Sequence, residues 1–396
     1  MTHYDPLCYP DDISRLLFHA TKLEALQMHF STRMRDQSEP SVHLSYFFRR
    51  NIAAKRKLRL KTVGLYNLFA GVDSVEMIDA VDSTCCEHFT SLNTFGNDED
   101  RGPLSNGNAT HFLDSNWLVP IDVEHPKPKS VRLDHLATYH AQDLARSTGL
   151  ERLYLINARH KPDVPPGDTA FSSPPNSEAS SPSASASAPC GSSTTPRSAR
   201  GVATPNTALR DLYFDNICNV CGPTLQHLIL PARWPLPTAM IARLIRSCPN
   251  LTQLSCAMEC TSFDMIRMLM PFLSNLWAIR VLAPAQGGDE GRKRKAMFDR
   301  FAGLDDAYHE EKFAQELSPD QKNGAKGDFP DLKYIGLGHK VWEIGGLVEQ
   351  TIQVTDQEED GPVQREEIVW RRKVKRIQEK DVMDVEIWKM DTLDVI

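Results

Sequence analysis

The chain has 396 residues, a hydrophobic fraction of 41% and a formal net charge of −7 at pH 7. This apolar content is enough for a substantial core. The negative net charge excludes a globally basic surface, so nucleic acid is not expected as the main partner. The 9 cysteines follow no disulfide-framework spacing, and no secretory leader or long apolar stretch is present. We therefore expect an intracellular protein, cytoplasmic or nuclear, without membrane contact.

One short pattern, L-x-x-L-x-L, recurs along the chain. Its apolar positions are spaced so that one side of a short strand faces a core, and repeated copies are typical of stacked repeats. Clear copies lie at 23–28, 150–155, 209–214, 225–230, 251–256, 276–281 and 332–337. The pattern predicts an α/β leucine-rich-repeat solenoid, with a curved parallel sheet on the concave side and helices on the convex side.

Residues 1–160 are predicted to form degenerate N-terminal repeats. Helical spacing over 13–20 and 139–147 places a helix before the strands at 23–28 and 150–156. Degenerate strands are expected around Leu58 and Leu60, around Phe89, Leu92 and Phe95, and around Val131 and Leu133. The stretch from 96 to 129 is rich in Asn, Asp, Gly and Pro, which predicts loop.

Residues 161–206 are predicted to be a disordered insertion. The segment is dominated by Ser, Pro and Ala, which bury too little apolar surface to offset the entropy of ordering. Because the repeat pattern resumes at Leu209, we interpret the segment as an insertion within one solenoid.

Residues 207–340 are predicted to form the C-terminal repeats, with an insertion at 284–328. Helices are expected over 238–248 and 262–273, and one charged helix over 296–317. Leu209 and Leu225 are only 16 residues apart, whereas Leu225 and Leu251 are 26 apart, so the repeat that begins at Leu209 is expected to lack its helix. Residues 341–396 are predicted to form a C-terminal cap with strands near 348–354, 367–372 and 385–389.

The positions between the core leucines are the candidate binding residues. In the predicted strands these side chains point away from the core, onto the concave face, where Tyr and Arg are frequent hot-spot residues. The predicted protein-binding residues are Gln27, Arg152, Tyr154, Asp211, Tyr213, Asp215, His227, Gln253, Arg280 and Tyr334.

No motif assigns a catalytic residue, a metal or a cofactor. Cys218 and Cys221 form a C-x-x-C that could bind zinc with Cys256 and Cys260, but Cys256 occupies a core position, so a small apolar role is favoured. The basic run 292–295 could be a nuclear localisation signal or an anion-binding patch, and a solvated loop is the simpler interpretation.

The segment Cys248 to Leu254 (CPNLTQL) resembles the repeats of F-box/leucine-rich-repeat proteins. The Ser/Pro-rich insertion and the charged tail around Trp388 are similar to filamentous-fungal members of this group. The resemblance, strongest over 130–160 and 207–340, implies substrate capture for a cullin-RING ubiquitin ligase. An F-box, which binds the Skp1-type adaptor, is not seen before the helix that begins near Asp12, so adaptor binding is not implied.

The sequence therefore predicts a non-enzymatic protein-protein interaction module. Its partner could be a ubiquitination substrate, or the chain could be a standalone scaffold unrelated to ubiquitin. An enzyme with a site in the irregular segments 96–129 or 341–396 is the third alternative.

Overall fold

The structure is a computed structural model of the chain. It describes residues 8–29, 44–66, 77–92, 128–134, 136, 138–156, 205–269, 275–285, 288–318, 332–358 and 361–391. Nearly all of the predicted loop at 96–129, most of the predicted insertion at 161–206, and Phe95 lie outside these residues.

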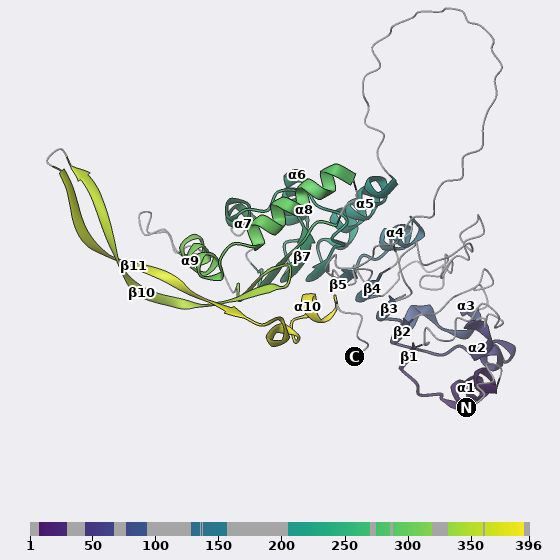
Figure 1. Cartoon of the computed structure of the whole chain (residues 1–396). Coiled ribbons are helices and arrows are strands. Elements are labelled where there is room, and N and C mark those ends of the chain that lie inside the picture. The colour runs from purple at the N-terminus through teal and green to yellow at the C-terminus, as the bar shows by residue number, and fades with distance from the viewer. Residues whose placement is uncertain are drawn as a thin grey trace, which may run out of the picture.

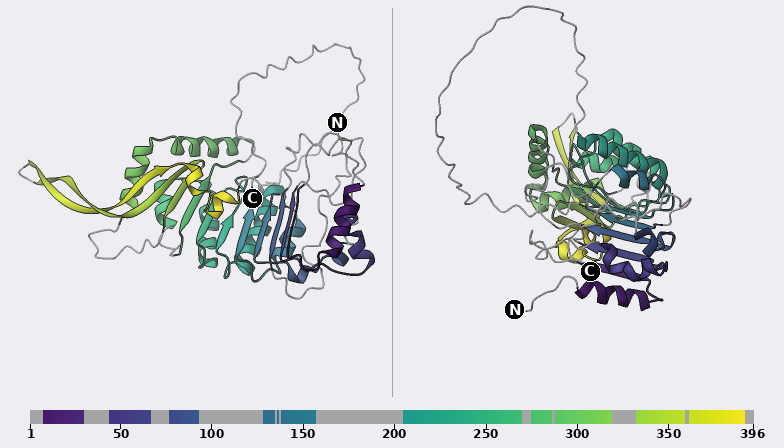
Figure 2. Two further views of the ribbon diagram at one scale, coloured as in Figure 1. Left: turned by 90° about the horizontal axis from the view of Figure 1, so that it is seen from below. Right: turned by 90° about the vertical axis from the view of Figure 1, so that its right-hand side faces the viewer.

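The fold is a mixed α/β arrangement around one 11-stranded sheet whose strands follow chain order. Strands β1 to β9 pair in parallel, and β10 and β11 then add antiparallel at one end. Figure 2 shows the strands side by side from the N-terminal to the C-terminal end. The strands are β1 Ala25–His29, β2 Thr62–Tyr66, β3 His88–Leu92, β4 Ser130–Leu133, β5 Arg152–Leu155, β6 His227–Ile229, β7 Gln253–Ala257, β8 Ala278–Leu282, β9 Tyr334–Leu337, β10 Lys340–Glu358 and β11 Gly361–Ile377.

Helices lie in the connections between parallel strands that the structure describes, and Figure 1 shows α4 to α7 along one side of the sheet and α10 on the other. The α-helices are α1 Cys8–His19, α2 Leu44–Ala53, α3 Met77–Ala80, α4 Thr138–Leu144, α5 Pro205–Asn216, α6 Thr238–Ser247, α7 Phe263–Leu269, α8 Gly288–Ala302, α9 Asp306–Glu316 and α10 Glu386–Lys389. Short helical turns are η3 Ser83–Cys85, η7 Ile217–Cys221, which is a π-helix, and η10 Glu379–Val382.

Two rows of apolar side chains run across the parallel strands and form the core. Leu153 is in register with Leu228, which is in register with Leu254, and all three are fully buried. Strand side chains alternate between the two sides, so these rows pack under the helices while the intervening residues face the other side.

The same backbone hydrogen bonds recur at every step from β1 to β9. The carbonyl just before a strand accepts two N–H groups from the start of the next strand, as Gln226 does from Thr252 and Gln253. The carbonyl of Thr252 does the same for Trp277 and Ala278. This repetition fixes the register of the outward-facing residues along the whole sheet.

Most of the predicted strands are confirmed. The copies at 23–28, 150–155, 225–230, 251–256, 276–281 and 332–337 overlap β1, β5, β6, β7, β8 and β9 and end within one residue of them. The degenerate strands expected near Phe89 and Val131 are β3 and β4, and the tail strands expected at 348–354 and 367–372 lie within β10 and β11. The helices expected at 13–20, 139–147, 238–248 and 262–273 correspond to α1, α4, α6 and α7.

The strand predicted from the copy at 209–214 is wrong, because these residues lie in α5. Spacing of three and four residues also fits one face of a helix, and here it places Tyr213 and Phe214 in the core. The short step before β6 therefore has a helix.

Three smaller predictions also need correction. The strand expected at Leu58 and Leu60 lies slightly later, as β2, while Leu58 makes only an isolated bridge to Val81. The single helix expected over 296–317 is two helices, because α8 ends before Gly303 and Asp305 caps the start of α9. The last predicted strand, 385–389, is instead the short helix α10.

Candidate functional site

The candidate site is the side of β4 to β9 that faces away from the core helices. Strand register brings outward residues from distant parts of the sequence into two adjacent rows. We define the strand face by the residues Arg132, Arg152, Tyr154, His227, Gln253, Arg280 and Tyr334.

The C-terminal segment, residues 378–391, folds back across the strand face. Its apolar side chains Val382, Val385, Ile387 and Trp388 are buried in one cluster with outward residues of the strands, including Tyr154. Complete burial of such a side chain stabilises by about 1.5–3 kcal/mol. Helix α10 therefore contacts β6 and β7 as a packed element on the side opposite the helices (Figure 1).

Glu386 is the centre of one polar cluster in this contact. Its Oε2 lies 2.7 Å from Nδ1 of His227, and it also accepts a hydrogen bond from the Tyr154 hydroxyl. Arg152 lies 3.5 Å from the other carboxylate oxygen. The hydrogen bonds from His227 and Tyr154, together with these positive charges, lower the pKa of Glu386 to about 2. Burial raises the pKa of Tyr154, so its hydroxyl remains a donor.

Arg280 is the centre of a second polar cluster. Its guanidinium lies 2.9 Å from Asp391 and 3.2 Å from Glu379, while the side chain itself is only 7% exposed. It also lies 5.9 Å from the centre of the Trp388 ring. A buried guanidinium requires compensating charge and hydrogen bonds, and here the C-terminal segment provides both.

The strand face also binds backbone atoms of the segment. Nε of Arg132 donates to the carbonyl of Met390 at 2.9 Å, and the side-chain oxygen of Gln253 accepts from the N–H of Ile387 at 3.2 Å. Contacts to both backbone and side chains are the means by which a surface recognises an extended or short helical polypeptide. The geometry is therefore suited to holding a peptide.

The structure brings six predicted binding residues together and leaves the others elsewhere. Arg152, Tyr154, His227, Gln253, Arg280 and Tyr334 all lie on the strand face. Gln27 lies on β1, far along the same side of the sheet, and is exposed.

Asp211, Tyr213 and Asp215 are not on the strand face, because α5 carries them on the helix side. Tyr213 is fully buried, with its ring centre 5.3 Å from that of Trp234. Asp215 forms an exposed ion pair with Arg243. These positions would have been outward only if 209–214 had been a strand.

Sequence reasoning did not identify Arg132 or the acidic residues of the C-terminal segment. Arg132 could have been found, because it lies between Val131 and Leu133 in the same pattern that identified Arg152 and Tyr154. The segment had no comparable signal, since its fold depends on contacts with strands far away in the sequence.

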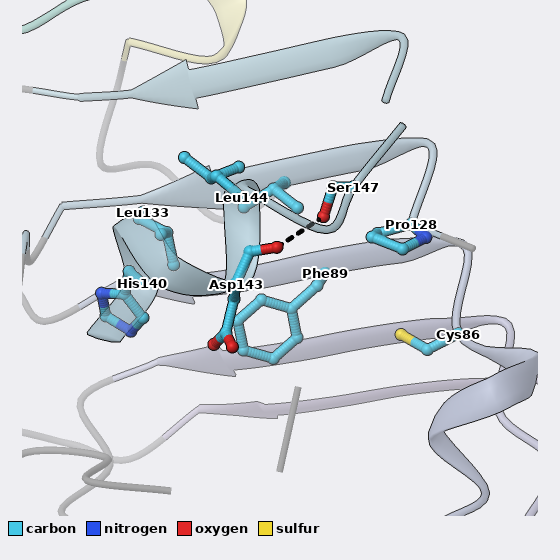
Figure 3. Close-up of a pocket in the computed structure, with 9 residues that line it drawn as sticks. Cys86, Phe89, Pro128, Leu133, His140, Asp143, Leu144 and Ser147 are labelled. Carbon is cyan, nitrogen blue, oxygen red and sulfur yellow. Dashed lines mark hydrogen bonds between the residues drawn. The ribbon is translucent and has the colours of Figure 1, made fainter. Parts of the chain in front are cut away.

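A small cavity lies between α4 and strands β3 and β4, with the Asp143 carboxylate beside the Phe89 ring (Figure 3). Its volume of about 30 Å³ has room for only one or two water molecules. Burial raises the pKa of Asp143 to about 6 and that of the Cys86 thiol to about 12. The thiol is therefore protonated at neutral pH and is a poor nucleophile.

The candidate zinc ligands are not gathered into a site. Cys218 and Cys221 are buried in η7, Cys256 is in the core of β7, and Cys260 is exposed. Within the residues that the structure describes, no group of three metal-ligating side chains is present. No helix in the same residues is both apolar and long enough to cross a membrane.

The sequence matches no family model, no curated protein and no solved structure.

Proposed function

We propose that the chain is a leucine-rich-repeat solenoid that binds a polypeptide segment of a partner protein on its strand face. The repeat interpretation is supported by the identical hydrogen bonds from strand to strand. It is also supported by a recurring asparagine, since Asn250 and Asn275 each donate to the carbonyl of a proline in the preceding connection. Periodic backbone geometry of this kind is characteristic of stacked repeats.

The observation that carries the proposal is that the strand face already holds a polypeptide segment of its own chain, residues 378–391. Arg132 and Gln253 bind the backbone of the C-terminal segment, while His227 and Arg280 bind its carboxylates. A partner segment with acidic and apolar side chains would make the same contacts. The C-terminal segment then competes with the partner, which lowers the apparent affinity of the full chain.

A labelled peptide of residues 378–391 tests the proposal by fluorescence anisotropy. The protein is the full chain carrying Trp388→Ala, which removes the largest buried side chain of the segment and loosens its hold on the strand face. We expect this chain to bind the peptide saturably and more tightly than the unmodified chain does, because the internal competitor is weakened.

Two further variants identify the surface. Adding Arg280→Ala to the Trp388→Ala chain should abolish binding of the peptide. Adding Arg292→Ala should not, because Arg292 is highly exposed on α8. A peptide with Glu386→Gln should bind more weakly. The proposal fails if the Trp388→Ala chain keeps its circular dichroism spectrum but does not bind the peptide. It also fails if Arg280→Ala leaves binding of the peptide unchanged.

The resemblance of CPNLTQL to F-box/leucine-rich-repeat proteins supports a narrower proposal, in which the partner is a ubiquitination substrate. Affinity purification of the full chain, followed by mass spectrometry, separates the alternatives. Recovery of cullin and a Skp1-type adaptor would support the ligase role. Recovery of a partner without these subunits would favour a standalone scaffold.

A further inference from the structure

The β10–β11 ribbon, residues 340–377, projects from the end of the sheet as a two-stranded arm (Figures 1 and 2). Isolated two-stranded ribbons are only marginally stable in water. This one exposes large apolar side chains, with Ile368 55% exposed and Trp370 48% exposed. Such a surface on an extended arm is unusual unless something covers it.

The outer edge of β11 has two parts. Near the sheet, α9 and Ser318, which follows it, cover this edge, since the N–H of Arg376 donates to Glu310 at 2.7 Å and the N–H of Arg372 donates to Ser318 at 2.9 Å. Backbone N–H groups alternate in direction along a strand, so those of Ile368 and Trp370 face the same outer edge. Among the described strands, β11 pairs only with β10, so this outer stretch is an unpaired edge.

The sequence along this edge is complementary to itself. Residues 366–372 read E-E-I-V-W-R-R. When two such strands run antiparallel with Val369 opposite Val369, Glu367 faces Arg371 of the second copy and Ile368 faces Trp370 of the second copy. Each contact occurs twice because the arrangement has two-fold symmetry.

This register also satisfies the backbone. Ile368 and Trp370 both have their N–H and C=O groups on the outer edge, so the two residues form a hydrogen-bonded pair across the junction. Centring the junction on Ile368 instead places Glu367 opposite Val369 and loses both ion pairs. Centring it on Trp370 would pair Ile368 with Arg372, whose N–H is already bound to Ser318. Aromatic and β-branched cross-strand neighbours are a favourable combination, and opposite charges in facing positions add to it.

We propose that the partner of this edge is a second copy of the chain. Two β11 strands pair antiparallel about Val369 over residues 367–371, the part of the edge that α9 and Ser318 leave open, so that at the junction they form a four-stranded sheet with the order β10-β11-β11-β10. The apolar side chains Leu347, Ile368 and Trp370 of both copies then lie on one side of that sheet. The strand face takes no part, so the dimer is independent of the proposed function.

Charge reversal tests the dimer by sedimentation velocity on the full chain at a series of concentrations. We expect a reversible monomer–dimer equilibrium. Glu367→Arg and Arg371→Glu should each raise the dissociation constant by roughly tenfold, because each change creates two like-charge contacts. The double variant Glu367→Arg/Arg371→Glu should restore the unmodified value, and Glu311→Arg on the exposed side of α9 should not alter it.

A disulfide test fixes the register. Val369→Cys places two thiols opposite one another in a non-hydrogen-bonded pair, where the Cα separation suits a disulfide. Oxidation should link this variant into dimers above the level of the parent chain, while Val348→Cys, on the neighbouring strand, should not. The proposal is overturned if the chain sediments as a monomer at every concentration, or if both single charge reversals leave dimerisation unchanged.

Discussion

His227 and Glu386 are 159 positions apart in the chain, yet Nδ1 of His227 lies 2.7 Å from Oε2 of Glu386. The histidine is at the start of β6, and the glutamate begins α10. Tyr154 on β5 donates to the same carboxylate oxygen. One carboxylate thus ties the C-terminal segment to two adjacent strands, and its protonation should loosen that contact.

Glu386→Gln should reduce stability in a pH-dependent manner. The pKa of Glu386 is about 2 in the folded protein and 4.5 in the unfolded chain. A carboxyl with a lowered folded pKa contributes stability above the unfolded pKa and loses it as pH falls toward the folded pKa. At pH 7 the variant should be less stable by about 2 kcal/mol, after allowance for the exposed part of the side chain.

Urea unfolding at several pH values measures this difference. It should be constant above about pH 5, shrink between the two pKa values and approach zero near pH 2. If the difference in unfolding free energy does not depend on pH over this interval, the Glu386 carboxylate is not stabilised in its charged form by His227 and Tyr154.

Arg280→Ala should lower the free energy of unfolding by about 3 kcal/mol, because it leaves Asp391 and Glu379 without their buried partner. Arg292→Ala is the matched control. Its side chain is 80% exposed and pairs with Asp289 on the same helix, so the change should stay within about 0.5 kcal/mol. Equal effects of the two substitutions in urea unfolding would argue against a buried role for Arg280.

Gly336→Ala should be destabilising by about 1–3 kcal/mol through overpacking. A Cβ at this position would lie 2.7 Å from Cζ2 of Trp388 and 3.1 Å from Cγ of Arg280. Gly346→Ala provides the control, since nothing lies within 4 Å of its Cβ. Thermal unfolding followed by circular dichroism compares the two, and a Gly336→Ala chain as stable as the Gly346→Ala chain would place Trp388 elsewhere.

Tyr213→Ala should cost about 3–5 kcal/mol, because the ring is fully buried against Trp234. Asp211→Ala, two residues earlier on the same helix, should change stability by less than about 0.5 kcal/mol, since its side chain is 55% exposed. Chemical denaturation of both variants distinguishes the helix from a strand. If Tyr213 were outward on a strand, its replacement would be tolerated.

Much of the sheet could be predicted because its period is local. Leu225, Leu228 and Leu230 share the spacing of Leu251, Leu254 and Cys256, and each set overlaps a strand. The same spacing gave a wrong strand prediction at Leu209, because L-x-x-L also fits one face of a helix. A window of six residues does not distinguish a helix from a strand. Only the neighbouring residues of α5, which continue the helix in both directions, settle the choice.

The site could be predicted only in part. Alternation along a strand identified Arg152, Tyr154 and His227 as outward residues, and they lie together on the strand face. That Tyr154 and Arg280 are buried could not be foreseen, because the covering segment arrives from the end of the chain. Its fold is set by tertiary contacts rather than by local periodicity.

Amide hydrogen exchange over residues 379–391 in the full chain tests most directly whether the strand face holds this segment. The N–H of Ile387 is bound to Gln253, and the surrounding side chains are buried, so the segment should exchange almost as slowly as strand β7. Arg280→Ala should speed exchange in the segment while leaving α6 protected. Exchange of 379–391 at the rate of an unfolded peptide in the unmodified chain would contradict the claim that the strand face holds a polypeptide.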